Sequence, residues 1–282
     1  MRSRLLASAA IATIAATVLA GCGGSSASAP AENCTPAHPG LKTIQEGTLA
    51  VAQYAYPPFS YYENGKLTGV EGDVLTAIAE MECLTIKVIS GEAAAMITNV
   101  QTGRADTTLG SWYRTKARAE IVNLSQPVVT SPLSFVSATG VNTVDGMKEL
   151  TVGAVTGLVG LDALQALLGD KLKTYADNAS LASDIKAGRI EGFVQGLGAA
   201  IATIDQFKLE GFVAQPIQAD PRLPVTLSVG QTNFPTNKNN PDLSRAIDED
   251  INQIRSSGKL AEIAKKYGYP VEATEPGEPN LL

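Results

Sequence analysis

The chain of 282 residues carries a formal net charge of −6 and contains one histidine and three cysteines. An acidic chain of this kind does not favour nucleic acid or anionic lipid as a partner. We expect the single histidine, His38, to lie on a flexible, solvated segment, which excludes Ser-His-Asp and Cys-His nucleophilic catalysis. The spacing of cysteine, histidine and aspartate matches neither a zinc nor a calcium motif. We therefore expect no metal and no cofactor.

The first 45 residues have the composition of an export signal followed by a linker. Arg2 and Arg4 precede an apolar stretch that ends in Leu19-Ala20-Gly21-Cys22, which predicts a signal peptide over residues 1–21. Leu-Ala-Gly-Cys also matches the bacterial lipobox, and this resemblance implies that Cys22 becomes the lipidated first residue. The alternative is an ordinary signal peptide with a chance cysteine. Small residues, serine and proline follow, so we expect a flexible tether over residues 22–45.

Cys34 and Cys83 remain as a possible pair once Cys22 is assigned to lipid. Because export leads to an oxidising compartment, we expect a disulfide between them. It would close a long loop and contribute about 2–4 kcal/mol. The competing interpretation is two unrelated buried thiols.

The first folded part reads as alternating strands and helices. Residues 48–52 and 84–89 are strand-like, and Asn64-Gly65 predicts a hairpin over residues 61–67. A helix begins near Gly69, with Asp73 as an acid near its N-terminus. The proline-rich loop of residues 53–59 is rigid; we assign Phe59 to the core.

Residues 93–127 form the centre of the predicted site. An apolar helix containing Met96, Ile97 and Val100 precedes a short strand over residues 105–110, and a loop with two aromatic and three cationic residues follows. Open α/β sheets bind ligands at the carboxyl ends of their strands. Arg118 is therefore our first candidate for a ligand contact.

A second unit follows with the same helix, glycine and strand order. Residues 150–155 predict a strand, and the turn of residues 156–160 leads into a helix whose free N–H groups favour an anion. A plain turn is the alternative. Residues 180–196 again read as helix, glycine and strand, and residues 225–229 predict the strand that returns to the first unit. Two helices end the fold, the first capped by Asn240, and we expect a loosely held tail after Tyr269.

These segments resemble, in consistent order, the bacterial solute-binding proteins of the amino-acid type, family 3. Residues 100–106 fit L-x-x-G-x-x-D, Thr115 and Arg118 fit G-x-T-x-T-x-x-R, and residues 124–127 fit the following F-S-x-P. The resemblance implies an α/β, two-lobed periplasmic-binding-protein-like fold of type II, with two hinge strands and a ligand cleft. The first lobe would comprise residues 46–128 and 227–282, and the second residues 129–226.

The resemblance also implies roles for particular residues. The arginine of the motif, Arg118, would pair with a ligand carboxylate in a bidentate manner. Where the family often has a second-lobe aspartate that pairs with an α-ammonium group, this chain has Gln195 or Gly196, and Ser111 and Tyr113 replace the motif's glycine and threonine. The candidate ligand-binding set is Arg118, Tyr113, Ser111, Trp112, Thr115, Tyr54, Tyr56, Gln195 and the backbone amides of Gly157, Leu158 and Val159.

The family suggests a function in uptake. We expect an exported, lipid-anchored, monomeric protein outside the cytoplasm that binds a small carboxylate-bearing solute and delivers it to an ABC permease and its ATPase, without catalysis. A dehydratase-type enzyme acting on a cyclic acid, and a sensory module that presents its ligand to a membrane receptor, are the alternatives on the same fold.

Overall fold

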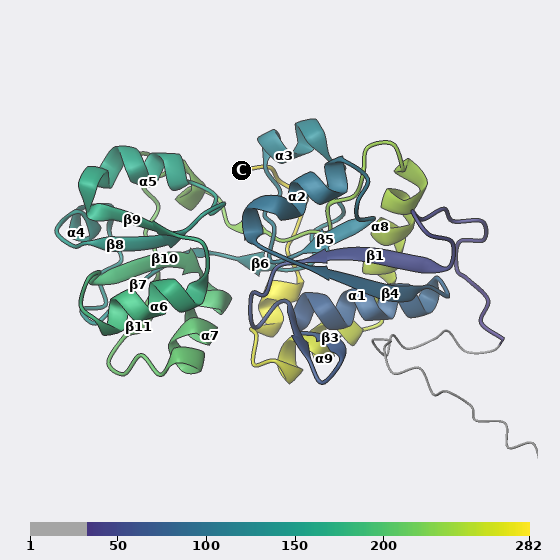
Figure 1. Ribbon diagram of the computed structural model, residues 1–282, viewed down its shortest axis with the longest axis horizontal. Coiled ribbons are helices and arrows are strands. Elements are labelled where there is room, and N and C mark those ends of the chain that lie inside the picture. The colour runs from purple at the N-terminus through teal and green to yellow at the C-terminus, as the bar shows by residue number, and fades with distance from the viewer. Residues whose placement is uncertain (1–32) are drawn as a thin grey trace, which may run out of the picture.

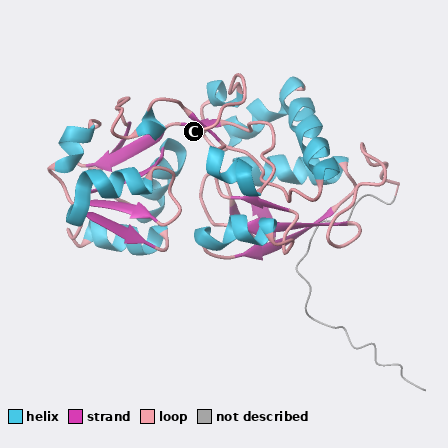
Figure 2. Cartoon of the chain, turned by 90° about the horizontal axis from the view of Figure 1, so that it is seen from above, coloured by secondary structure: helices cyan, strands magenta, loops and turns pink. Residues whose placement is uncertain are grey.

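The computed structural model describes residues 33–282. The predicted signal peptide and Cys22 lie outside these residues. Figure 1 shows two lobes connected by a narrow crossing that contains β6 (Thr130–Ser131), and β12 (Gly230–Gln231) pairs with this strand in antiparallel orientation. We call the part around β1 the first lobe and the part around the five-stranded sheet the second lobe. Figure 2 shows helices packed around the strands of both lobes. None of the helices within residues 33–282 combines the length and the apolar character that a membrane crossing requires.

The first lobe is built on a three-stranded parallel sheet in the order β4-β1-β5. Its central strand is buried along almost its whole length, as expected for an apolar strand with neighbours on both sides. Helix α1 packs against α8 and α9, which return from the end of the chain. The elements are β1 (Thr48–Gln53), β2 (Tyr61–Glu63), β3 (Lys66–Thr68), α1 (Val70–Met81), β4 (Thr85–Ser90), α2 (Ala93–Gln101), β5 (Thr107–Leu109), α3 (Lys116–Ile121), α8 (Pro241–Ser256), α9 (Lys259–Lys266) and η3 (Val271–Thr274).

The second lobe contains a mixed sheet in the order β11-β7-β10-β8-β9. Strand β10 pairs with β8 in parallel and with β7 in antiparallel orientation, so it lies at the centre of the lobe. All five residues of β10 are buried. The elements are β7 (Leu133–Ser137), α4 (Val144–Lys148), β8 (Val152–Val155), α5 (Leu161–Leu168), η1 (Gly169–Lys171), β9 (Leu172–Tyr175), α6 (Asn178–Lys186), β10 (Gly192–Gly196), α7 (Leu197–Phe207), β11 (Val213–Pro216) and η2 (Pro224–Thr226).

The return strand predicted over residues 225–229 is wrong. Pro224 begins a 3₁₀ turn, η2, and Leu227 and Val229 are exposed. The pairing occurs just after this segment, where Gly230 and Gln231 pair with Ser131 and Thr130. A strand of two residues has too little apolar periodicity to be recognised in a sequence.

The tail after Tyr269 is attached to the crossing strands β6 and β12, which we call the hinge. We had expected a loose end. The side chain of Gln231 donates to the carbonyl groups of Pro276 (2.9 Å) and Glu278 (2.8 Å) and accepts from the N–H of Asn280 (2.8 Å). Leu282 packs against the apolar cluster of the second lobe. The tail therefore lies between the two lobes, where Figure 1 marks the C-terminal end.

The N-terminal segment from Cys34 to Gln45 is also attached, so the flexible tether predicted through residue 45 is wrong for these residues. Cys34 forms the predicted disulfide with Cys83, and Ile44 donates its N–H to Asp106 at 2.9 Å. His38, which we expected to be solvated, is partly buried and bonded to Glu82. Polar contacts over such sequence distances leave no periodic signal in the sequence.

Candidate ligand-binding site

A cavity lies between the lobes and encloses about 500 Å³ free of protein atoms, including the open solvent at its mouth. The first lobe contributes the loops after β1 and β5, and the second contributes the turn after β8 and the end of β10. The lining residues are Tyr54, Tyr56, Ala93, Gly110, Ser111, Trp112, Tyr113, Arg118, Val155, Thr156, Gly157, Leu158, Val159, Val194, Gln195 and Gly196.

Arg118 is the only charged side chain among these lining residues. Thr115 caps α3 by accepting the Arg118 N–H at 3.2 Å, which fixes the backbone that carries the guanidinium. Nη1 donates to the carbonyl of Tyr113 at 2.7 Å, and the guanidinium lies over the Trp112 ring, 5.2 Å from its centroid. Burial lowers the pKa of Arg118 to about 10, so the group remains positive at neutral pH. Within residues 33–282 no carboxylate forms an ion pair with it.

Aromatic rings form the first-lobe wall of the cavity. Tyr54 lies 6.3 Å from Trp112 and 5.7 Å from Tyr56, measured between ring centroids, and Tyr56 continues the row to Phe59 at 6.2 Å. Trp112 is fixed by a hydrogen bond from Nε1 to Oγ1 of Thr108 at 3.1 Å. The wall is therefore mainly apolar, and the Tyr54 hydroxyl is a buried polar atom in it without a partner among the described residues. Phe59 is fully buried, as predicted.

Glu71 holds the loop after β5, which carries Trp112. Its Oε2 accepts from the N–H groups of Gly110 (3.1 Å) and Ser111 (2.9 Å), although Glu71 is itself fully buried. Both loop residues have positive φ, 145° and 59°, and a Cβ on Gly110 would lie 3.2 Å from the Trp112 ring. Burial raises the pKa of Glu71 to about 6. We did not single out this residue from the sequence, because Asp73 is an acid in the same first turn and nothing in the sequence distinguishes the two.

The second-lobe turn offers backbone N–H groups on the opposite side of the cavity. Leu158 donates its N–H to the carbonyl of Val155 at 3.1 Å, so this amide is already bonded within the turn. The N–H groups of Gly157 and Val159 have no acceptor within residues 33–282. Gly157 and Val159 both line the cavity, so two N–H groups without an acceptor in that range lie on the lobe opposite the one that carries Arg118.

The end of β10 presents no carboxylate. The Gln195 side chain donates to Asn178 (2.6 Å) and accepts from Thr203 (3.0 Å), so both ends of its amide have partners. A Cβ on Gly196 would lie 2.9 Å from the Tyr113 hydroxyl and 2.7 Å from Ser131 Oγ. Tyr113 in turn donates from its hydroxyl to the Ser131 carbonyl at 2.7 Å. The Tyr113 hydroxyl and the Ser131 side chain therefore occupy the space that a longer side chain at position 196 would need.

The geometry joins a positive group, two free N–H groups and an aromatic wall in one cavity between two lobes. Residues 49–270 match the family described as bacterial extracellular solute-binding proteins, family 3. The chain belongs to this family.

Similar proteins support the family assignment and the fold. The probable amino-acid-binding protein YxeM of Bacillus subtilis (strain 168) is 28% identical over 218 residues, which cover 74% of this chain and 79% of YxeM. The L-cystine-binding protein TcyJ of Escherichia coli (strain K12) is 25% identical over 236 residues, or 80% of this chain and 84% of TcyJ. The crystal structure of EhuB in complex with hydroxyectoine superposes with a TM-score of 0.72 at 21% identity, covering 83% of this chain and 93% of EhuB. The predicted two-lobed fold is thereby confirmed.

In this family 3 protein, most of the candidate residues predicted from the sequence line one cavity. Thr115 is the exception, because it caps α3 and reaches the cavity only through the position of Arg118. The lining residues that sequence reasoning did not select are small or aliphatic, and such residues carry no chemical signature in a sequence. They are Ala93, Gly110, Val155, Thr156, Val194 and Gly196.

Proposed function

We propose that this family 3 protein is the substrate-binding lipoprotein of an ABC importer. It captures a small carboxylate-bearing solute, an amino acid or an amino-acid-like compound, and delivers it to a membrane permease and its ATPase. Lipidation of Cys22 would hold the protein on the outer side of the cell membrane. We expect the protein to act as a monomer. The ligand would draw the two lobes, residues 46–128 with 227–282 and residues 129–226, together about their crossing strands.

The position of Arg118 carries this proposal. A guanidinium without an acidic partner, partly buried in a cavity, favours an anion, and its planar donors match a carboxylate in a bidentate manner. The free N–H groups of Gly157 and Val159 are on the other lobe and would bind the same carboxylate. Because the anion then contacts both lobes, its binding would stabilise the closed form.

The rest of the lining restricts the body of the ligand. Trp112 and Tyr54 offer ring faces, and the lining contains no acidic side chain that would pair with an α-ammonium group. A carboxylate with a flat or apolar body and no strong positive charge therefore fits this lining best. The amide of Gln195, already bonded at both ends, does not replace the missing acid.

Catalysis is not part of the proposal. General acid–base chemistry needs a side chain that titrates near neutral pH and reaches the substrate. The lining residues include neither an acid nor an imidazole, and burial raises the pKa of Tyr113 to about 12. A dehydratase of a cyclic acid would need such a group in the cavity.

Calorimetric titration of Arg118 variants tests the proposal. Candidate ligands are first screened by thermal shift in pairs. Each pair consists of an α-amino acid and the same carboxylate without its amino group, such as phenylalanine with 3-phenylpropanoate and histidine with imidazole propanoate. Arg118→Ala should cost about 2–5 kcal/mol of binding free energy, and Arg118→Lys should restore part of it by charge alone. Lys116→Ala, which removes an exposed cation from the same helix, is the matched control and should bind normally.

Equal affinity in wild type and Arg118→Ala would overturn the assignment of the carboxylate site. Tighter binding of the zwitterionic member of each pair would show that the missing acid does not exclude an α-ammonium group. Conversion of a bound ligand to a new product, followed by chromatography, would replace the binding function by an enzymatic one.

A further inference from the structure

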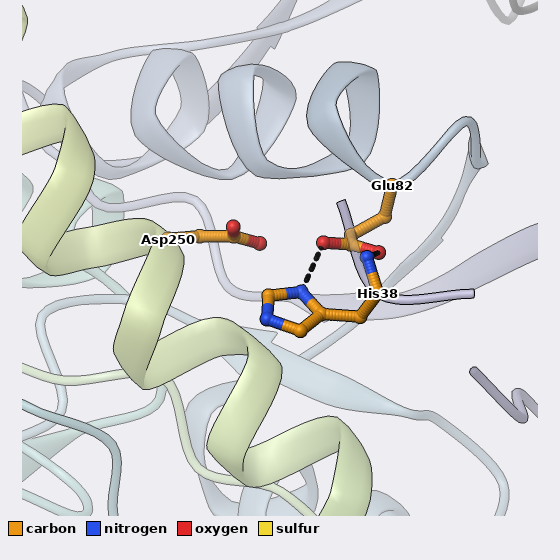
Figure 3. A group of neighbouring side chains, drawn as sticks. All are labelled: His38, Glu82 and Asp250. Atoms are coloured by element: carbon orange, nitrogen blue, oxygen red, sulfur yellow. Dashed lines mark hydrogen bonds and ion pairs between the residues drawn. The ribbon is translucent and has the colours of Figure 1, made fainter. Parts of the chain in front are cut away.

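A second cluster of polar side chains lies on the first lobe and shares no residue with the cavity between the lobes. His38 comes from the N-terminal segment, Glu82 follows the last residue of α1, and Asp250 lies on α8. Figure 3 shows the three side chains converging. Each offers one ligand atom, and these atoms lie within 4.8 Å of one another. The side chain of Glu82 and the whole of Asp250 are each 1% exposed.

The two nitrogens of His38 have separate partners. Nε2 lies 3.0 Å from Oε2 of Glu249, and Nδ1 lies 2.6 Å from Oε1 of Glu82. The second carboxylate oxygen of Glu82 accepts the backbone N–H of His38 at 3.1 Å, which fixes its orientation. At 2.6 Å a proton lies between Nδ1 and Glu82. When that proton leaves, Nε2 can keep its own proton on Glu249, and the lone pair of Nδ1 is then directed towards Glu82. A carboxylate on the far nitrogen is the arrangement that orients metal-binding histidines.

Asp250 supplies the observation that points to a cation. Both of its carboxylate oxygens are buried, and neither has a hydrogen-bond partner within residues 33–282. Figure 3 shows this carboxylate directed towards His38 and Glu82. Leaving a buried carboxylate without a partner is costly. Because Glu82, Glu249 and Asp250 surround a single imidazole, even a protonated His38 would leave an excess of negative charge.

We propose that His38, Glu82 and Asp250 bind a divalent transition-metal cation of the Zn²⁺ class, with Glu249 orienting the imidazole. One imidazole nitrogen with two carboxylate oxygens is a donor set that Zn²⁺ accepts, whereas Ca²⁺ and Mg²⁺ prefer oxygen alone. The cation would replace the proton between His38 and Glu82. Ligands of a tetrahedral Zn²⁺ ion lie roughly 3.3 Å apart, so His38 and Glu82 would separate slightly while Asp250 moves closer.

Such a site would link three elements that are distant in the sequence. His38 and Glu82 are 44 residues apart, and His38 and Glu249, the neighbour of Asp250, are 211 residues apart. The expectation of no metal rested on the spacing of residues along the chain, which cannot detect a site of this kind. A bound cation would attach the N-terminal segment to α1 and α8 beside the Cys34–Cys83 disulfide.

Zinc binding to the full, untagged protein tests the proposal. After treatment with EDTA and dialysis, ZnCl₂ should bind in a 1:1 ratio by calorimetry and raise the midpoint of thermal unfolding, and EDTA should reverse both effects. His38→Gln and Asp250→Asn should abolish binding. Glu249→Gln should weaken it about 10–100-fold. Glu262→Gln, which removes an exposed acid from α9, is the control and should bind as wild type does.

The single histidine of the chain gives a readout that does not depend on any variant folding. In protein labelled with ¹⁵N-histidine, Zn²⁺ should shift the Nδ1 resonance, while Nε2 keeps its proton. Co²⁺ should produce visible absorption bands typical of tetrahedral coordination, and Zn²⁺ should displace them. Absence of a ¹⁵N shift in the wild type, or Zn²⁺ binding that survives in both His38→Gln and Asp250→Asn, would overturn the proposal and leave a cluster that shares protons.

Discussion

Single side chains in this protein act on the cavity from outside it. Glu71 does not line the cavity, yet it holds the two N–H groups that give Gly110 and Ser111 their conformation. Thr115 acts in a similar way on Arg118 by capping α3. The loop geometry therefore depends on buried residues that contact no ligand. A change in either residue should alter affinity through the position of the loop.

Glu71→Gln should change the pH dependence of stability. Burial raises the pKa of Glu71 from 4.5 to about 6, so the folded protein binds this proton more tightly than the unfolded chain. Stability from this group is therefore present below about pH 4.5 and is lost as the pH rises to about 6, an effect of about 2 kcal/mol. Glutamine does not titrate, so the variant should lack this loss.

Urea denaturation between pH 4 and pH 7 measures the effect as the difference between the two proteins. Other acids whose pKa is raised, such as Asp106 and Asp248, titrate in both and cancel in that difference. Parallel pH profiles for wild type and Glu71→Gln would contradict the prediction.

Whole elements were predictable where apolar residues recur with a regular period. The strands at β1, β4 and β8 and the helices α2, α8 and α9 agree with the predicted segments, and Asn240 caps α8 as expected. The features that we predicted wrongly have no regular recurrence of apolar residues. Strand β12 has two residues, and the tail and the segment around His38 are held by polar contacts between distant residues.

The candidate site was predictable where its residues are chemically distinctive. Arg118 and Trp112 stand out because charged and aromatic residues are chemically distinctive at the end of a strand. Glu71 was not singled out because its role depends on a loop 39 residues away. Gly196 was named through the resemblance as a position without an acid, but the sequence could not show that the Tyr113 hydroxyl and Ser131 occupy the space beside it.

Gln231→Ala should release the tail from the hinge. The variant removes three partly buried hydrogen bonds to residues 276–280, which costs about 1 kcal/mol or more because each partner loses its bond but can be reached by water. Hydrogen exchange of the tail, above all of the Asn280 N–H, should become faster. Gln215→Ala is the control, because Gln215 is exposed on β11. Equal exchange in both variants would show that other contacts hold the tail.

The molecule as a whole consists of two lobes with different attachments. The N-terminal segment, the disulfide and the cluster around His38 all belong to the first lobe. The tail instead reaches from the hinge to Arg114 and to the apolar cluster of the second lobe. The first lobe is therefore the cross-linked part. The tail contacts both lobes, so a change in the angle between them would alter its contacts.

Replacing Cys34 and Cys83 by serine should lower the free energy of unfolding by about 2–4 kcal/mol, because the disulfide closes a loop of 49 residues. Ligand affinity should not change, since neither cysteine lines the cavity. Urea denaturation in EDTA, with wild type in the presence and absence of reductant, measures the first effect without interference from metal. If the variant also lost about 2–4 kcal/mol of ligand-binding free energy, the prediction would be wrong, and the disulfide would be needed for the native conformation of the cavity.

Trp112 is the only tryptophan of the chain, and it stands in the cavity wall between Arg118 and Tyr54. Intrinsic fluorescence excited beyond the tyrosine band therefore comes from one indole at one place. Its emission wavelength reports whether water or solute covers that ring, and a quencher such as acrylamide reports how open the mouth is. The protein thus contains its own optical probe, with no dye and no engineered label required.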